Sequence, residues 1–320
     1  RFDCTESADA GLAAARLLGE AGEEWEASQA GVLAQTVLVH AGRFAQAEEL
    51  TEGLVRFMRR VGHRSVEMWV LRNTGTVALL RSGDLDAYAA FVEQFVEVHR
   101  SMGAPWPNNA APLVGMAAFW RGDWTTAAAH LEEGARLEVG SVDFGRNHAA
   151  LLRLDAYRSG SAAVRERWAY FRATRSPVPW LSAGDQLMAI AGAEAWAAVG
   201  EHAEAAALYP QIAEASAHGT LIAWDDLRLL ATAAGISAAA GGNWKLAEAH
   251  FTEALRQADT LPHRLEQPEV RRLWAEALLH RRAGTDTDRA RELLRDALGA
   301  YRRLGMPRHA SLTEADLARC

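Results

Sequence analysis

The sequence contains few of the residues that would cross-link or anchor a protein. Its two cysteines, Cys4 and Cys320, lie at opposite ends of 320 residues, so we expect neither a disulfide framework nor a cysteine-based zinc site. No stretch approaches the roughly 20 uninterrupted apolar residues that span a bilayer, and no charged segment followed by an apolar one marks a secretion signal. We therefore expect a cytoplasmic protein that has no membrane partner.

Lysine is almost absent, because Lys245 is the only lysine among 34 lysines and arginines. The formal net charge is −7, which is unsuited to wrapping a phosphate backbone, so we expect no direct nucleic-acid contact from this segment. Alanine, glycine and arginine are abundant, and their GC-rich codons indicate a bacterial source of high GC content. The chain begins at Arg1 rather than at a methionine, so we expect it to be part of a longer polypeptide.

A turn motif recurs about every forty residues. A glycine is followed by one or two polar or aromatic residues, and a small residue stands five positions after it, as in Gly42–Ala47 and Gly122–Ala127. Glycine suits the position after a helix because it adopts the left-handed conformation at little cost. The pattern predicts helical hairpins in which the glycine ends the first helix. The glycines are Gly42, Gly83, Gly122, Gly160, Gly200, Gly242 and Gly284, with spacings of 41, 39, 38, 40, 42 and 42, and the turn after Gly160 is degenerate.

Apolar and small residues support this prediction. After Gly42 they follow helical spacing and predict a helix over 44–61, with Phe44, Ala47, Leu50, Leu54 and Phe57 on one face. A second small residue stands seven positions before most of the glycines, where two helices would need to approach closely. Its clearest instances are Gly115, Ala193, Gly235 and Ala277.

The small residue, the Gly-Asp-Trp turn at Gly122–Trp124 and the alanine five positions after the glycine resemble the tetratricopeptide repeat. The resemblance runs over most of the chain, although the period near 40 exceeds the 34 residues of that repeat. Longer helices at this period resemble the C-terminal superhelical domains of bacterial LuxR-type (maltose-regulator-like) activators and ATPase–cyclase signal-transduction proteins. The resemblance implies an all-α fold, a right-handed superhelix (α-solenoid) of about seven tetratricopeptide-like helical hairpins.

We expect one continuous helical-repeat array over residues 1–320. Within it, 1–26 is a partial N-terminal repeat, 27–307 holds seven helical hairpins, and 308–320 is a C-terminal capping helix. Ser311 and Glu314 have the spacing of a capping box, which predicts that the last helix opens at Ser311.

Motifs of catalysis and metal binding are lacking. Gly241–Lys245 does not have the spacing of a phosphate loop, and the eleven histidines form no metal-binding pattern. We interpret Asp225 and Asp226 as opening a helix, where carboxylates favour the N-terminal dipole; the alternative is a pair of catalytic acids. We therefore expect no catalytic residue, metal ion or cofactor, and a protein that is not an enzyme.

First helices line the concave face of such superhelices, so aromatic and polar residues on them are the candidate ligand contacts. Aromatic rings stack on apolar ligands, while amide, carboxylate and guanidinium groups hydrogen-bond polar ones. The alternative for each residue is core packing or a solvated surface. The candidates are Trp69, Asn73, Asn109, Trp120, Asn147, Glu194, Trp224, Arg228, Arg271 and Trp274.

Three functions remain open from the sequence. The first is a ligand-sensing or protein-interaction module of a larger bacterial signalling or transcription regulator, which binds on its concave face. Its partner would be another protein or regulatory domains of the same longer chain, with a possible small-molecule inducer. The second is a stand-alone scaffold that recognises a partner peptide or helix. The third is an enzyme on a helical-repeat frame, which the lack of converging acid, base or nucleophile makes the least favoured.

Overall fold

The computed structural model describes residues 4–103, 110–141, 144–175 and 183–320. These residues form an all-α structure in which no strand occurs, apart from an isolated antiparallel bridge between Ile222 and Leu229. None of the described helices is long and apolar enough to cross a membrane.

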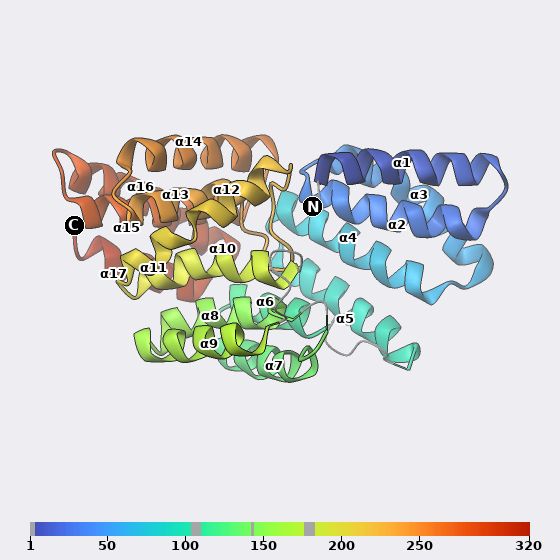
Figure 1. The fold of residues 1–320 in the computed structure, drawn as a ribbon, viewed down its shortest axis with the longest axis horizontal. Coiled ribbons are helices and arrows are strands. Elements are labelled where there is room, and N and C mark those ends of the chain that lie inside the picture. Colours follow the sequence, from blue (N-terminus) through green and yellow to red (C-terminus); the bar gives the residue numbers. More distant parts are fainter. Residues whose placement is uncertain (1–3, 104–109, 142–143, 176–182) are drawn as a thin grey trace.

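Consecutive helices pack against each other in pairs (Figure 1). The first helices are α2 Glu24–His40, α4 Arg64–Ser82, α6 Ala111–Trp120, α8 Arg146–Arg158, α10 Ala183–Ala198, α13 Leu230–Ala240 and α15 Glu266–Arg281. Their partners are α3 Phe44–Val61, α5 Leu85–Ser101, α7 Trp124–Leu137, α9 Ser161–Thr174, α14 Trp244–Thr260 and α16 Asp286–Leu304. The partner of α10 is divided into α11 His202–Ala207 and α12 Tyr209–Ala217, and α1 Cys4–Glu20 and α17 Pro307–Leu317 flank the array.

The repeated turn acts through two residues. The glycine is left-handed, with φ of +70° at Gly83 and +74° at Gly242. The residue after it caps the second helix: Asp84 accepts hydrogen bonds from the backbone N–H groups of Asp86 and Ala87, at 3.1 and 2.8 Å. Because the first N–H groups of a helix have no partner within the helix, such a cap both ends the turn and starts the next helix.

Small residues set the spacing within each pair, as the sequence predicted. A Cβ atom added to Gly115 would collide with Leu131 of the paired helix, and one added to Gly235 would lie 3.0 Å from the ring of Phe251. The predicted helix over 44–61 is α3, which buries Phe44, Ala47, Leu54 and Phe57 on one face. The second helices thus cover the first helices, which are buried on most sides.

One helix boundary differs from expectation. The last helix begins at Pro307 rather than at Ser311, whose hydroxyl lies inside the helix and donates to the Pro307 carbonyl at 3.0 Å. The capping-box prediction was therefore wrong, because proline is itself suited to the first turn of a helix. A separate feature is the break between α11 and α12. It falls beside Pro210, which has no N–H group to continue the hydrogen-bond ladder.

The C-terminal part of the array returns to the N-terminal part through three contacts, which we call the closure. The carbonyl of His40 accepts from the N–H groups of Leu221 and Ile222, both at 3.0 Å. The carbonyl of Leu80 accepts from Arg264 at 2.7 Å, and Pro307 lies against Gly122. Each contact joins the end of a first helix in the N-terminal half to the segment before α13, to the segment before α15 or to the start of α17.

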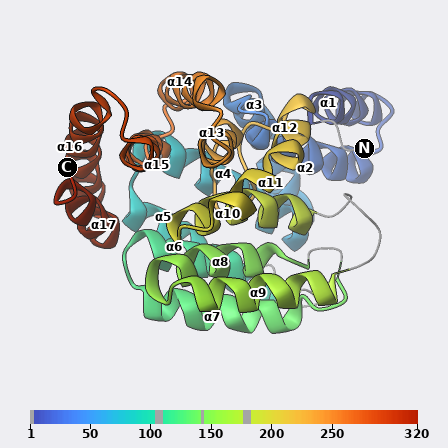
Figure 2. The same cartoon turned by 60° about the vertical axis from the view of Figure 1, so that its left-hand side comes forward.

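Each of these three contacts connects positions about 180 residues apart. The two parts of the array are therefore paired with nearly the same sequence offset at all three contacts. The main apolar core continues across it, from Leu79 and Phe119 to Ile222 and Tyr301. Figure 2 shows α4 and α13 close to the middle of the molecule, α15 beside α16 and α17 on its left, and α7 and α9 on its lower edge. The N-terminal and C-terminal parts of the array therefore share an apolar core.

The closure predicts that the repeated glycines differ in importance. Gly83→Ala and Gly242→Ala both place a side chain at positive φ, which costs about 1 kcal/mol. At Gly83 the new methyl group would also collide with Leu304, whereas nothing lies within 4 Å at Gly242. We expect Gly83→Ala to lose about 1–3 kcal/mol more than Gly242→Ala because of this overpacking, measured by urea unfolding. Equal losses in the two variants would contradict the closure.

Candidate functional site

A cluster of buried charges fills the centre of the molecule. The guanidinium of Arg228 bonds to Glu194 at 2.7 Å, to Glu266 at 2.8 Å and to Glu269 at 2.8 Å. Arg153 approaches Glu194 at 3.0 Å. All of these side chains are less than 10% exposed. Arg228 thereby links α10 to α15 by binding glutamates of both helices.

A second group of charges centres on Asp225. Arg146 binds both of its carboxylate oxygens, at 2.8 and 3.0 Å, and Arg72 reaches one of them at 2.8 Å. The Arg72 guanidinium lies over the ring of Trp224, and that ring stacks on His40 at 4.5 Å. Asp225 therefore joins α4 and α8 to the segment that precedes α13.

This segment, residues 219–229, has an unusual backbone. Asp225 and Leu227 both have φ of +58°, a conformation that residues other than glycine rarely adopt. The bridge between Ile222 and Leu229 holds the ends of the segment together. Strained backbone persists where the surroundings over-determine it, and here the ion pairs of Asp225 and of Arg228 supply that restraint.

The same segment corrects two expectations. Asp225 and Asp226 do not open a helix, since α13 begins at Leu230; they are buried and paired with arginines. Arg228 does not lie on a first helix either, but in the loop before it. The helix prediction was wrong because this segment forms ion pairs with residues that are far from it in the sequence. These ion pairs outweigh local helix propensity.

Burial and pairing shift the ionisation of these groups in opposite directions. Burial alone would raise the pKa of Asp225, but Arg146 and Arg72 lower it to about 2. Burial raises the pKa of Glu266 to about 7 in spite of Arg228, which lowers it. Burial, together with Arg72, lowers the pKa of His40 to about 3, so its imidazole is neutral. The pKa values of the buried carboxyl groups of Asp225 and Glu266 are thus shifted in opposite directions, one to about 2 and the other to about 7.

Arg272 extends the network to the C-terminal helices. It donates to the hydroxyl of Tyr157 at 2.6 Å and pairs with Glu276. The hydroxyl of Tyr301 donates to Glu269. Tyr157 lies on α8 and Arg272 on α15, so this hydrogen bond joins helices from the middle and the end of the chain.

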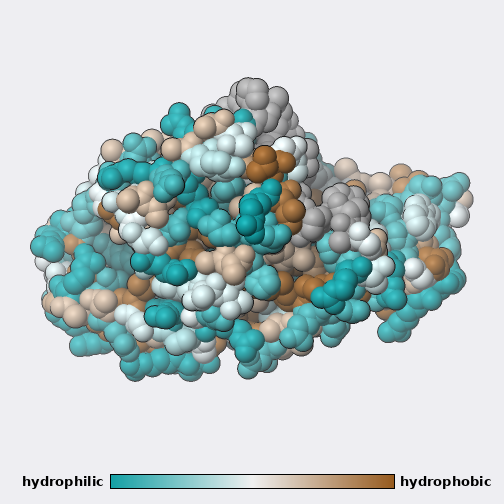
Figure 3. Space-filling view, turned by 90° about the horizontal axis from the view of Figure 1, so that it is seen from below, coloured by the Kyte–Doolittle hydropathy of each residue, from teal (hydrophilic) through white to brown (hydrophobic). Residues whose placement is uncertain are grey.

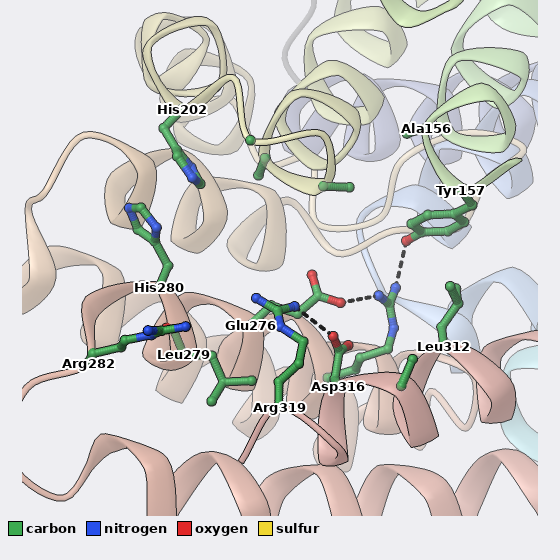
Figure 4. Close-up of a pocket in the computed structure, with 15 residues that line it drawn as sticks. Ala156, Tyr157, His202, Glu276, Leu279, His280, Arg282, Leu312, Asp316 and Arg319 are labelled. Atoms are coloured by element: carbon green, nitrogen blue, oxygen red, sulfur yellow. Dashed lines mark hydrogen bonds and ion pairs between the residues drawn. The ribbon is translucent and has the colours of Figure 1, made fainter. Parts of the chain in front are cut away.

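A cavity of about 590 Å³ opens at this junction (Figure 4). Its walls come from the C-terminal ends of α8 and α10, from the start of α11, and from α15 and α17. This volume is in the range of sites for small molecules. The polar and charged groups on its walls are Tyr157, His202, Arg272, Glu276, His280, Arg282, Asp316 and Arg319.

Two carboxyl groups meet at the floor of the cavity. Glu276 and Asp316 interact through their side chains, and Glu276 also accepts from Arg272. Burial raises the pKa of Glu276 to about 7, helped by Asp316 and opposed by Arg272. Arg319 binds the other side of Asp316 at 2.9 Å. Near neutral pH Glu276 is therefore close to its titration point.

Two histidines lie face to face at the other end of the cavity. The rings of His202 and His280 are 3.8 Å apart. Burial and the neighbouring His280 lower the pKa of His202. Arg282, which follows in the same turn, has φ of +53° and donates from Nε to the Leu279 carbonyl at 3.1 Å. This end of the cavity thus presents imidazole and guanidinium groups, whereas the floor presents carboxyl groups.

The residues predicted to face an open groove are mostly inside the protein. Asn73 donates to Gln35 and Thr36, and Asn147 donates to Glu138. Trp120, Asn147, Glu194, Arg228, Trp274 and Asn73 are buried, whereas Trp69, Trp224 and Arg271 are half-buried. For the six buried residues the expected exposure was wrong, because other parts of the chain cover them. Asn109 lies outside the described residues.

Of these candidates, Glu194 comes nearest to the cavity, because it lines a smaller hollow that shares His202, Glu276 and His280 with it. Sequence reasoning missed these last three residues. The two histidines are 78 positions apart and the two acids lie on different helices, so no local motif marks them.

No family model matches the chain, and no curated protein is detectably similar to it. Among the described residues, no group of three or more histidines, cysteines and acids could hold a metal ion.

The charge cluster predicts a strong dependence of stability on Arg228. Removal of one partner from a buried ion pair leaves unpaired charge in the interior and costs about 3–5 kcal/mol. We therefore expect Arg228→Met to lower the urea midpoint sharply, because three glutamates lose their shared partner. Arg256→Met, which removes an exposed arginine paired with Glu253, is the control and should leave the midpoint near that of the wild type. Similar midpoints for both variants would show that the cluster contributes little.

Proposed function

We propose that the chain is the ligand-sensing module of a larger bacterial signalling or transcription regulator. In this proposal the chain is a right-handed superhelix of about seven tetratricopeptide-like hairpins, as the repeated turn favours. Its partners are regulatory domains of the same longer chain or another protein in the cytoplasm. The ligand binds in the cavity beside Glu276 rather than along an open concave groove, because the closure occupies that groove.

The observation that carries the proposal is the position of the cavity. Helices α8, α10 and α11 form one wall, and α15 and α17 form the other. A ligand that touches both walls favours the closed arrangement over any arrangement in which they separate, by the difference in its affinity for the two. Each repeat contacts mainly its neighbours, and the closure adds contacts between distant repeats. A change at the cavity would therefore be passed along the array.

The physical basis of such a response is the hydrogen bond between Arg272 and Tyr157, which crosses the cavity beside Glu276 (Figure 4). A group bound to Glu276 would change the partners of Arg272. Arg272 in turn contacts Glu269, which shares Arg228 with Glu194. The cavity therefore has a continuous set of ion pairs behind it that leads to the centre of the molecule.

A panel of metabolites, tested by isothermal titration and thermal shift, examines the proposal. We expect a ligand that binds the wild type and raises its melting temperature, because binding to the folded form alone adds stability. Ala315→Trp should abolish this binding, because Ala315 is exposed on the wall of the cavity and tryptophan fills it. Ala45→Trp, at an exposed site on α3, is the control that should bind normally. Binding that survives Ala315→Trp would place the ligand elsewhere.

The second candidate is a scaffold that recognises a helix from another protein, and a groove favours it. Helices α5, α6 and α7 enclose a hollow of about 890 Å³, whose floor includes Val92, Val96 and Val114. Figure 3 views the molecule from the side of α5, α7 and α9 and shows a largely hydrophilic surface with apolar residues in the hollows between helices. An amphipathic helix could lay its apolar face into such a groove.

A pull-down separates the two candidates. If the protein is a scaffold, Val96→Glu should remove a captured partner, because a charge on the apolar floor opposes docking of a helix. Ala315→Trp should then have no effect on capture. Loss of capture in Ala315→Trp alone would favour the cavity and the ligand-sensing function.

A further inference from the structure

Resting on the proposed function, we propose that the cavity ligand is a small organic anion, whose carboxylate or phosphate group binds between His202, His280 and Arg282. Three features of the cavity support this: the hydrogen-bond donors left over at one end, the balance of charge on its walls, and the way that balance changes with pH.

Donor groups are left over at the histidine end. Within the described residues, neither imidazole has a hydrogen-bond partner, and the terminal nitrogens of Arg282 have none either. The other two arginines on the walls are engaged, since Arg272 binds Tyr157 and Glu276, and Arg319 binds Asp316. A guanidinium beside two imidazoles offers several N–H groups in one direction, which suits the oxygens of an anion.

The walls carry three arginines and two acids, a formal charge of +1 in a chain of net charge −7. Because burial raises the pKa of Glu276 to about 7, this acid is only partly charged near neutral pH. The cavity is thus a positive site on an acidic protein, and an acidic surface makes such a site selective for compact anions rather than polyanions.

Other charged groups near the histidines are already paired or turned away. Arg281 binds Asp286, Glu201 binds Arg165, and Glu204 lines a different cavity beside α9. Glu194, in the adjoining hollow, is held by Arg153 and Arg228. The groups that remain to respond to an anion are the two imidazoles, Arg282 and the pair of acids at the floor.

The rings of His202 and His280 lie 3.8 Å apart, and burial, together with His280, lowers the pKa of His202. An anion between these rings and Arg282 would favour the protonated form of His202. Lower pH also neutralises Glu276, whose pKa is about 7. Both changes make the cavity more positive, so affinity for an anion should rise as pH falls from 8 to 6.

Titration calorimetry with inorganic phosphate and with succinate tests the inference, and comparison of the two shows which anionic group is preferred. We expect Arg282→Gln to weaken binding about ten-fold or more, since a hydrogen bond to a charged group contributes about 1.5–3 kcal/mol. Arg295→Gln, at an exposed position on α16, is the matched control and should bind like the wild type. In Glu276→Gln the rise in affinity between pH 8 and pH 6 should be smaller than in the wild type, because this variant lacks the carboxyl group whose pKa is about 7.

Glucose and spermidine serve as neutral and cationic probes. If either binds in a manner blocked by Ala315→Trp while phosphate and succinate do not bind, the anion inference is overturned and the ligand-sensing function stands. If the anions bind equally well to Arg282→Gln and the wild type, the assigned position is wrong. If no probe and no member of the metabolite panel binds, both the inference and the proposed function fail.

Discussion

The sharing of Arg228 by three glutamates is the interaction on which the rest of the structure depends. Transfer of a charge from water to a protein interior is costly unless the charge forms ion pairs and hydrogen bonds there. Arg228 finds Glu194 on α10 and Glu266 and Glu269 on α15, so these helices must be in place together. The segment that carries Arg228 also carries Asp225, which binds α4 and α8 through Arg72 and Arg146. The closed array therefore forms as one cooperative unit, whereas an open solenoid could assemble repeat by repeat.

The same network explains why the cavity has unusual chemistry. Among the described residues the ion-pair network contains six carboxyl groups and five guanidinium groups, so the acids outnumber the arginines by one. The two acids that are most easily protonated are Glu266 and Glu276, whose pKa values burial raises to about 7. Glu266 is enclosed, but the side chain of Glu276 is 26% exposed and reaches the cavity. The members are Glu194, Asp225, Asp226, Glu266, Glu269, Glu276, Arg72, Arg146, Arg153, Arg228 and Arg272.

The sequence was a good guide to features that depend on neighbouring residues. The glycine turn and the small residue that lets two helices approach both follow from local geometry, and the structure contains them at Gly122 and Gly115. The site was harder to predict. Candidate residues such as Asn73 and Arg228 were chosen for an open face, but their partners lie on other repeats. Nothing in the order of residues shows that His202 faces His280.

One pattern in the sequence does contain information about the closure. Gly42, Gly83 and Gly122 pack against Leu261, Leu304 and Pro307, whereas Gly200 and Gly242 have open space where a side chain would project. A left-handed turn alone tolerates asparagine, but a turn that is also covered does not. The same glycine thus has two roles in the N-terminal half and one in the C-terminal half. Because the array closes through these turns, a side chain added at Gly42, Gly83 or Gly122 would push α2, α4 and α6 away from the segments before α13 and α15 and from the start of α17, and so disturb contacts between repeats that lie far apart in the sequence.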